Sequence, residues 1–384
     1  MRIGIEAQRL FRPHKHGMDR AALELILHLQ IIDKVNDYFI FVKPDQDATV
    51  IESTKNFQIV EVAGGPYPFW EQFKLPRIAK LYNCDILHCT SNTAPFFKQV
   101  PLITTLHDII YMEGSLLKLL TNKASLYQKL GNLYRRIIVR NVVRNSCCLI
   151  TVSNFEKYNI INFFKLKNKD IRTVYNGVSE KFTNIIDTYH AARVQRTHKL
   201  PEEYILHISN KDPRKNTKNV LKAYREYLKR TSNTHKLLLL GCTEACLKSM
   251  LMDIGAMDIY KEIRVMGYVL DEDLPVLYQL SKLFLFPSLR EGFGIPIIEA
   301  MACGVPVITS NTSSMPEVAG NAAHLINPNK TEALYKGMLK ILTDDVYKKK
   351  LIEKGLIQSK RFTWNRMASQ VLDQYKQLYR ELKT

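Results

Sequence analysis

The sequence predicts an α/β protein made of two lobes, each with a parallel sheet covered by helices. The chain has 384 residues, which is enough for two or three domains. Short apolar runs typical of buried strands alternate along it with amphipathic helical stretches. The alternation stops at the polar residues 183–200, before Pro201, and then starts again. We therefore expect two Rossmann-like lobes that face each other across a cleft, at residues 1–190 and 200–364, with the connection near residues 183–200.

The first half opens with a strand, a helix and a further series of strands. The expected strands are Ile3–Ala7, Tyr38–Val42, Phe57–Val62, Asp85–His88, Leu102–Leu106, Cys148–Val152 and Ile171–Val174. Between the first two of them, residues 19–31 are expected to form a helix, because Ala22, Leu25, Ile26 and Leu29 lie on one face at helical spacing.

The second half repeats this arrangement, with a helix expected from Lys218. Its expected strands are Tyr204–Ser209, Leu237–Leu240, Ile263–Val265, Leu283–Phe286 and Pro306–Thr309. The last segment, 363–384, is expected to be a helix with apolar side chains such as Met367 and Tyr375 on one side.

Composition and charge narrow the classes of protein. With 46% hydrophobic and 24% charged residues, the chain is neither disordered nor a fibrous repeat. The formal net charge of +18 favours anionic partners, which include nucleic acids, anionic membranes and phosphorylated small molecules. Seven cysteines, an odd number, do not suggest a disulfide framework, and Cys242 and Cys246 have no second close pair that would complete a zinc site. No signal peptide or bilayer-spanning run is recognisable, so a reducing cytoplasm is expected.

The segment 288–307 (SLREGFGIPIIEAMACGVPV) carries the densest chemical signal. A loop with Gly292 and Gly294 follows an expected strand, and a helix is expected from about Pro296. Glycine allows a ligand close to the backbone, and the amides of a helix start can bind an anion. Glu291 in the loop and Glu299 in the helix could hold hydroxyls of one elongated ligand. The alternative is an ordinary turn with solvated glutamates.

This segment resembles the E-x7-E signature of the family-4 retaining glycosyltransferases, most closely their bacterial mannosyltransferase branch. Further stretches match that family in order. They are the Gly17 loop, Thr105–Asp108, Thr151–Ser153, Tyr175–Val178, Asp212–Asn216, Gly267–Val269, Ser314–Gly320 and Phe362–Trp364. The resemblance covers nearly the whole chain. It implies the GT-B architecture, in which residues 365–384 return to the first lobe.

In the second lobe, the resemblance implies a set of donor-binding residues. Glu299 would bind the nucleotide ribose, and Glu291 would contact hydroxyls of the transferred sugar as part of the catalytic site. Arg214 and Lys215 would clamp the diphosphate and stabilise the charge that develops on the leaving group. The remaining donor contacts implied are Phe293, Gly294, Ile295 and Tyr268. Asn210 departs from the family, which often has glycine at that position.

In the first lobe, His107 would lie beside the donor sugar and stabilise an oxocarbenium-like transition state. The alternative for His107 and Asp108 is a hydrogen-bonded pair that caps a loop. Gly17 would let its loop approach the donor phosphate, although the family often has two glycines there. Acceptor contacts are expected from His14, Asp19 and Asp108, and from loops that include Pro66–Trp70 and Ser91–Phe97.

No metal or other cofactor is expected. Two Asp-x-Asp tripeptides, residues 45–47 and 271–273, superficially match the metal motif of the other glycosyltransferase architecture. Asp271 and Asp273 are better explained as residues that begin a helix and cap its free amides.

A basic amphipathic helix lies between Glu113 and Glu156, a stretch without acidic residues. Leu126, Leu130, Leu133 and Ile137 recur at helical spacing. Lys129, Arg136, Arg140 and Arg144 form a band beside this stripe, which suits an anionic membrane surface. The alternative is an ordinary solvated helix whose apolar stripe packs on its own lobe.

The leading hypothesis is a retaining transferase that moves a hexose, with GDP-mannose as the first choice of donor, to a glycan on a polyprenyl-diphosphate lipid at the inner membrane face. UDP-sugars are the alternative donors. A sugar-nucleotide phosphorylase or epimerase of the same architecture and a non-catalytic sugar-binding scaffold are alternatives as well. A basic nucleic-acid-binding protein is another class, but no zinc finger, RNA-recognition signature or helix-turn-helix supports it, so nucleic acid is not an expected partner.

Overall fold

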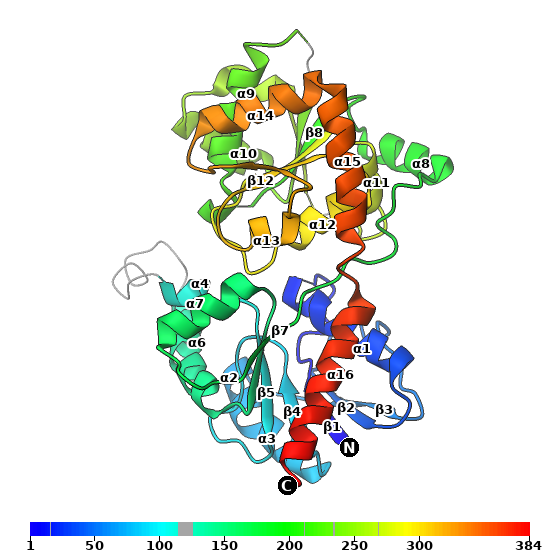
Figure 1. The fold of residues 1–384 in the computed structure, drawn as a ribbon, viewed down its shortest axis with the longest axis vertical. Coiled ribbons are helices and arrows are strands. Elements are labelled where there is room, and N and C mark those ends of the chain that lie inside the picture. The colour runs from blue at the N-terminus through cyan, green and yellow to red at the C-terminus, as the bar shows by residue number, and fades with distance from the viewer. Residues whose placement is uncertain (16, 114–125, 211, 233–234, 268) are drawn as a thin grey trace. The chain divides into compact units, whose positions relative to one another are not determined.

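The computed structural model describes residues 1–384 apart from 16, 114–125, 211, 233–234 and 268, and of residues 126–129 it describes the backbone alone. The chain forms two compact units. Unit 1 comprises Met1–Gly177 with Trp364–Thr384, and unit 2 comprises Val178–Thr363. Figure 1 shows a sheet flanked by helices in each unit.

Unit 1 is built on a parallel sheet with the strand order β3-β2-β1-β4-β5-β6-β7. Its strands are β1 (Arg2–Glu6), β2 (Asp37–Val42), β3 (Phe57–Glu61), β4 (Ile86–Cys89), β5 (Leu102–Leu106), β6 (Cys148–Thr151) and β7 (Ile171–Thr173). From β1 the chain adds strands first on one side, to β3, and then on the other side, starting with β4. The direction therefore reverses between β1 and β4, and the loops that follow these two strands diverge there.

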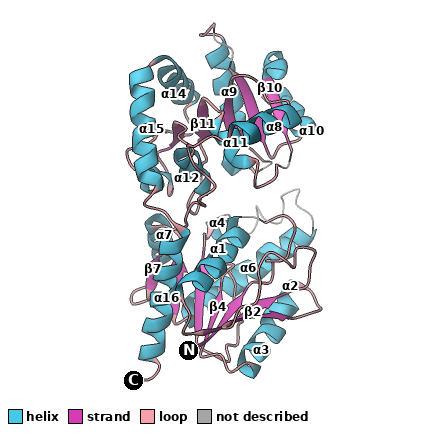
Figure 2. Cartoon of the chain, turned by 90° about the vertical axis from the view of Figure 1, so that its right-hand side faces the viewer, coloured by secondary structure: helices cyan, strands magenta, loops and turns pink. Residues whose placement is uncertain are grey.

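Helices cover both faces of this sheet (Figure 2). They are α1 (Gly17–Ile32), α2 (Tyr67–Phe69), the π-helical turn η1 (Trp70–Lys74), α3 (Leu75–Leu81), α4 (Ile110–Glu113), α6 (Leu126–Asn145), α7 (Asn154–Phe164) and α16 (Trp364–Glu381). On one face Leu75 of α3 and Val139 of α6 pack with strand residues such as Phe41 and Leu87 in a continuous apolar core. On the other face, α1 and α16 lie side by side.

A buried hydrogen-bond chain fastens α16 to the sheet of unit 1. Tyr375 of α16 is fully buried, and its hydroxyl lies 2.6 Å from Nδ1 of His88 in β4. Nε2 of the same ring is 2.8 Å from Thr105 Oγ1. Burial lowers the pKa of His88 to about 3, so the imidazole is neutral near pH 7. The chain therefore ends in the unit in which it begins.

Unit 2 has a second parallel sheet, with the strand order β10-β9-β8-β11-β12-β13. Its strands are β8 (Tyr204–Ile208), β9 (Lys236–Leu240), β10 (Ile263–Met266), β11 (Leu283–Phe286), β12 (Val307–Ser310) and β13 (His324–Ile326). Here the direction reverses between β8 and β11. Both sheets are thus of the doubly wound type, which confirms the expected α/β fold of two Rossmann-like units.

The helices of unit 2 enclose the sheet in the same way. They are α8 (Thr188–His198), the 3-10 turn η2 (Pro213–Lys215), α9 (Thr217–Leu228), α10 (Glu244–Asp253), η3 (Met257–Glu262), α11 (Leu274–Gln279), α12 (Ile295–Ala302), α13 (Met315–Ala319), α14 (Thr331–Thr343) and α15 (Asp345–Ser359). Tyr224 of α9, Leu247 of α10 and Met338 of α14 share one apolar core with β8, β9 and β11.

The polar stretch 183–200 contains a helix of unit 2, although the sequence suggested the connection between the lobes. Asp187 caps α8 by accepting hydrogen bonds from the amides of Tyr189 and His190. The buried carboxylate of Asp273 then binds α8 through His190 at 3.0 Å and Arg193 at 2.8 Å. The units divide earlier in the chain, between Gly177 and Val178. Within the described residues, no helix combines the length and hydrophobicity needed to cross a bilayer.

The attachment of α16 gives a prediction for stability. Replacing Tyr375 by phenylalanine leaves Nδ1 of His88 buried without its partner, which costs about 1–3 kcal/mol. We expect Tyr375→Phe to lower the urea midpoint of unfolding. Tyr379→Phe, on a half-buried ring of the same helix, serves as the matched control and should have little effect. Equal midpoints for Tyr375→Phe and the parent protein would contradict this role.

Candidate functional site

In unit 2 the loops that follow β8 and β11 carry the candidate site. These strands lie side by side at the reversal of strand order, where open α/β sheets bind ligands at the carboxyl ends of their strands. Two hydrogen bonds join the loops: Leu289 N donates to Arg214 O at 2.7 Å, and Asn216 Nδ2 donates to Pro287 O at 3.0 Å. The two loops are therefore held together as one ligand-sized surface.

An ion pair completes the connection between the two loops. Lys215 Nζ lies 2.7 Å from Glu291 Oε1, and both side chains are largely buried. The ammonium group also lies 4.9 Å from the ring centroid of Phe286, at the end of β11. The structure thus brings together one of the two expected diphosphate-binding cations and one of the two expected acids.

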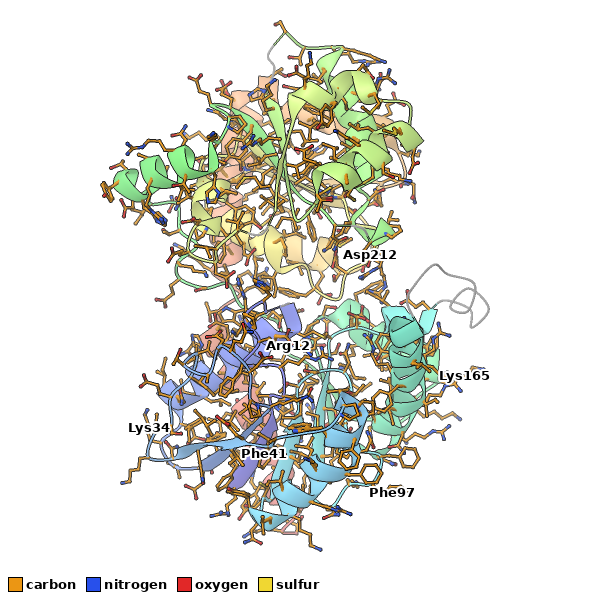
Figure 3. The ribbon with its side chains drawn as sticks, turned by 180° about the vertical axis from the view of Figure 1, so that it is seen from behind. Arg12, Lys34, Phe41, Phe97, Lys165 and Asp212 are labelled. Atoms are coloured by element: carbon orange, nitrogen blue, oxygen red, sulfur yellow. The ribbon has the colours of Figure 1, made fainter. Side chains whose placement is uncertain are left out.

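The other cation, Arg214, is oriented by its own loop. Asp212 caps η2 by accepting from Arg214 N at 2.9 Å, and its second oxygen binds Nη2 of the same arginine at 2.6 Å. Burial raises the pKa of Asp212, but hydrogen bonds from Arg214 outweigh it, and the net pKa is lowered. The carboxylate is therefore ionised near pH 7 and fixes the guanidinium. Figure 3 labels Asp212 at the edge of unit 2.

The start of α12 has the backbone geometry expected of an anion-binding turn. Gly294 is the N-cap residue, with φ at +102°, a conformation that favours glycine. Gly294 has no side chain with which to cap the first turn, Pro296 has no amide hydrogen, and Ile297 N donates to Gly294 O at 3.0 Å. The hydroxyl of Ser314 lies 2.9 Å from Phe293 O and 3.0 Å from Glu291 O, and Ser313 Oγ donates to Glu291 O at 2.8 Å. These serines from the β12–α13 loop hold the shape of the glycine loop.

Glu299 lies in the middle of α12 and is buried. Its Oε2 accepts a hydrogen bond of 3.1 Å from the hydroxyl of Tyr278 in α11. Glu291 and Glu299 therefore lie on the same loop–helix unit, as their spacing suggested, but in different surroundings: Glu291 is bonded to a cation and Glu299 to a phenol. Tyr268, the remaining expected donor contact, falls outside the described residues.

In unit 1, His107 follows β5 and is almost fully buried. Its Nε2 lies 2.9 Å from Thr90 O, and its backbone amide donates to Asn92 Oδ1 at 2.6 Å. Burial lowers the pKa of His107 more than Thr90, Asp108 and Asp19 raise it. Because a carbonyl only accepts, Nε2 carries the proton of the neutral ring, and Nδ1 is an unprotonated lone pair.

The other residues expected in the first lobe have different roles in the structure. Gly17 is the first residue of α1, Asp19 is buried in its first turn, and His14 lies on the exposed loop before it. Asp108 Oδ1 accepts from Ile110 N at 3.1 Å, so Asp108 stabilises the start of α4. Asp108 thus caps a helix start, whereas His107 is hydrogen-bonded to Thr90 and Asn92 and, among the described residues, not to Asp108.

The residues around a cavity in unit 1 were not predicted individually as site residues. Arg9 and Arg12 after β1, and Asn92 and Thr93 after β4, line a cavity of about 470 Å³ at the reversal of strand order. Tyr67 and Tyr134 form part of its wall. The loops 66–70 and 91–97 were predicted from the sequence, but the two arginines were not. A pair of basic residues directly after the first strand was the signal that could have identified them.

One acid of each Asp-x-Asp tripeptide pairs with basic side chains. Asp47 pairs with Lys15, and Asp273 with His190, Arg193 and His198. Asp273 stands at the start of α11, as expected, but its side chain makes no capping hydrogen bond, because these partners from α8 occupy both of its oxygens. Across the described parts of the chain, no cluster of three or more histidine, cysteine or acidic side chains could hold a metal ion.

The described part of the apolar stripe of α6 is exposed and does not pack on its own lobe. Leu130, Leu133 and Ile137 share a face with Arg140 and Arg144, and this outer stripe of α6 is exposed, with Ile137 at 57%. Val139 and Val142 on the opposite side fill the core. Arg136 is turned away from the expected band, because its Nε donates to Tyr111 O at 2.8 Å. The side chain of Lys129 falls outside the described part of the chain.

Two family models match the chain. Residues 41–182 match the model described as Glycosyltransferase Family 4, and residues 190–358 match the model described as Glycosyl transferases group 1. One similar protein is an O-antigen chain mannosyltransferase B of Escherichia coli, with 35% identity over 232 residues. That match covers 60% of this chain and 60% of the length of the relative.

Solved structures show the fold. HepE of Anabaena, in complex with UDP-glucose, has 16% identity and a TM-score of 0.75 over 98% of this chain and 100% of its own. WaaG, a glycosyltransferase involved in lipopolysaccharide biosynthesis, has 14% identity and a TM-score of 0.70 over 97% and 98% of the two chains. The chain thus shares the α/β fold of these proteins, the expected GT-B architecture.

The glycine at the start of α12 gives a second prediction. A Cβ at Gly294 would lie 3.1 Å from Ile297 Cδ1, on a backbone that side chains rarely adopt. We expect Gly294→Ala to lower the free energy of unfolding of unit 2 by about 1–3 kcal/mol, which a lower urea midpoint would report. Gly255→Ala is the matched control, since Gly255 also has a positive φ but lies in open space. A loss no larger than that of the control would show that the loop tolerates a side chain.

Proposed function

We propose, on the premise that this chain belongs to the family-4 glycosyltransferases, that it transfers a hexose from a nucleotide sugar to a glycan acceptor with retention at the anomeric carbon. The observation that carries the proposal is the Lys215–Glu291 pair at the β8–β11 reversal, next to the start of α12, where the N-cap residue is Gly294. A cation and amide donors suit a diphosphate, and an adjacent carboxylate suits the hydroxyls of a sugar.

Four residues of unit 2 have separate roles in the proposed donor site. Lys215 and Arg214 bind the diphosphate and stabilise the charge it gains as the sugar leaves. Because Lys215 is paired with Glu291, binding exchanges a carboxylate for phosphate and frees Glu291 to accept from sugar hydroxyls. Glu299, whose Oε2 accepts a hydrogen bond from Tyr278, is assigned to the ribose. These cations supply the charge that a metal supplies elsewhere, so we propose transfer without a divalent ion.

The proposed mechanism gives the proton to the leaving group. The glycosidic bond to the diphosphate breaks, the acceptor oxygen bonds to the anomeric carbon from the same face, and the departing phosphate takes the acceptor proton. His107 is neutral, and its Nδ1 lone pair can face positive charge on the sugar without competing for that proton. We therefore assign His107 an electrostatic role and not that of a general base.

GDP-mannose is the proposed donor. Similarity to the E. coli mannosyltransferase supports mannose as the sugar. HepE, solved with UDP-glucose, supports a UDP-sugar as the second candidate. A panel of nucleotide sugars, tested by thermal shift and by slow hydrolysis without acceptor, distinguishes the two.

Substitutions at the ion pair should separate diphosphate binding from sugar binding. Lys215→Ala removes a charge-assisted contact worth about 1.5–3 kcal/mol, so GDP should bind about 10–100-fold more weakly. Glu291→Gln should keep or strengthen GDP binding, since Lys215 loses its internal partner, but should lower transfer about 100-fold or more. Titration calorimetry and a transfer assay measure the two effects.

Lys336→Ala is the control, because Lys336 is an exposed residue of α14 that pairs with Glu332 one turn earlier in the same helix. Chelation of divalent ions should leave the transfer rate unchanged. GDP binding that survives Lys215→Ala intact, or activity that is lost on chelation and restored by manganese, would refute the proposed donor site.

We further propose that the acceptor is a glycan on a polyprenyl-diphosphate lipid and that α6 holds the enzyme on the inner face of the cytoplasmic membrane. The exposed outer stripe of α6 joins apolar side chains to Arg140 and Arg144, which suits insertion into an anionic surface. Phe97 lies beside the end of α6, where Lys98 Nζ donates to Asn145 O at 2.9 Å. Phe97 is 78% exposed and projects from the rim of unit 1 (Figure 3).

Membrane binding can be tested on the apolar and the basic part separately. Leu133→Glu with Ile137→Glu should reduce co-sedimentation with anionic phosphatidylglycerol vesicles at least tenfold. Two apolar side chains that become buried in the membrane contribute about 3 kcal/mol or more to binding. Arg140→Glu with Arg144→Glu should reduce it too, most strongly at low salt.

Val346→Glu with Ile357→Glu is the matched control, since both side chains are exposed on one face of α15 in unit 2. Arg136 is left unchanged because it anchors Tyr111. Vesicle binding that is the same for the α6 variants and the α15 control would refute the proposed surface.

A further inference from the structure

The cavity of unit 1 is a second ligand-sized site, separate from the residues assigned to the donor. Its volume of about 470 Å³ lies in the range of small-molecule pockets. It is formed where the loops after β1 and β4 diverge, which is the place where a doubly wound sheet binds ligands. Arg9 and Arg12 come from the first loop, and Ser91, Asn92 and Thr93 from the second.

The charged lining of this cavity is cationic. Arg9, Arg12 and Arg135 line it, and no carboxylate is among its lining residues in the described chain. Nε of Arg9 is buried without a hydrogen-bond partner among the described residues, and its guanidinium lies 5.3 Å from the ring centroid of Tyr67. Arg12 is exposed at the loop before α1 (Figure 3). Planar guanidinium groups bind phosphate oxygens in pairs.

Two acidic residues near the cavity, Glu71 and Glu6, are buried and are not among its lining residues in the described chain. Glu71 is fully buried and accepts hydrogen bonds from Tyr67, Thr93, Tyr134 and Gln72. Burial raises the pKa of Glu71, and it raises that of Glu6 to about 7. Among the described residues, the charged groups of the cavity lining are therefore basic.

The uncharged part of the lining suits a sugar ring. Tyr67 and Tyr134 stand edge to face, with centroids 6.2 Å apart and an interplanar angle of 83°. Glu71 fixes both phenols through their hydroxyl groups, so the rings are pre-oriented. Pro66 and Pro68 add rigid apolar surface next to them. Aromatic faces and polar loop side chains together can hold the apolar face and the hydroxyls of a pyranose.

One rim of the cavity belongs to α6. Leu130 and Gly131 line it, and Leu130 is also the first described member of the outer stripe, where it is 58% exposed. The stripe continues from that rim through Leu133 and Ile137. A ligand held in the cavity can therefore have an apolar chain running along the face that we assign to the membrane.

We propose that this cavity binds the head group of the lipid acceptor, with the diphosphate on Arg9, Arg12 and Arg135 and the first sugar against the wall that Tyr67 and Tyr134 form. The inference rests on the proposed function and deepens it. It assigns to the enzyme an acceptor whose diphosphate lies within the same cavity as its sugar, and so a short glycan close to its lipid.

The charge requirement can be tested with farnesyl diphosphate as a probe that carries the lipid and the diphosphate without a sugar. Wild-type protein should bind farnesyl diphosphate more tightly than farnesyl monophosphate, and farnesol more weakly than either. Arg12→Ala with Arg135→Ala should weaken diphosphate binding at least tenfold in titration calorimetry. Arg77→Ala, an exposed arginine on α3 of the same unit, should not.

Controls distinguish the outcomes. Equal loss in the Arg77 variant, or unchanged binding in the double variant, would overturn the assignment. Inorganic pyrophosphate binding as tightly as farnesyl diphosphate would overturn its lipid part. GDP binding that Lys215→Ala weakens and the double arginine variant leaves unchanged reports on unit 2, so failure of the head-group assignment and failure of the proposed donor site are separate results.

Discussion

The reversal of strand order in each parallel sheet is the constraint on which both candidate sites depend. Parallel strands place all their carboxyl ends at one edge, and helices normally close the gaps between successive loops. Where the winding direction changes, between β1 and β4 in unit 1 and between β8 and β11 in unit 2, neighbouring loops leave in opposite directions. The arginines of unit 1 and the Lys215–Glu291 pair of unit 2 both occupy these openings.

The sequence predicted the elements whose signals are local. Apolar runs identified strands from β1 to β12, and the loop that ends at Gly294 was placed correctly at the start of a helix. The short strand β13 (His324–Ile326) was missed because a half-buried edge strand of three residues carries no clear alternation. Helix α8 was interpreted as a connection, since its low hydrophobicity reflects a contact with Asp273 that no local pattern contains.

In the candidate site, too, the sequence predicted the local features but not the long-range contacts. The spacing of Glu291 and Glu299 and the basic pair at 214–215 were visible in the sequence, but the partner of each group was not. The pairing of Lys215 with Glu291 joins residues 76 positions apart, and the rotation of Arg136 toward Tyr111 depends on α4 packing against α6. Helical periodicity places a residue on a face, whereas long-range contacts decide where a long side chain on that face ends.

The cations of the two sites differ in whether they are paired with carboxylates, and this difference fits the ligands proposed for the sites. In unit 1 the acids are buried and hydrogen-bonded behind the lining, so an incoming anion meets the arginines first. In unit 2 each cation already has a carboxylate partner, Asp212 or Glu291. A diphosphate must replace part of that pairing, which lowers its net affinity. A donor site has to release a nucleoside diphosphate in every cycle, and internal ion pairs that re-form on release reduce the cost of that step.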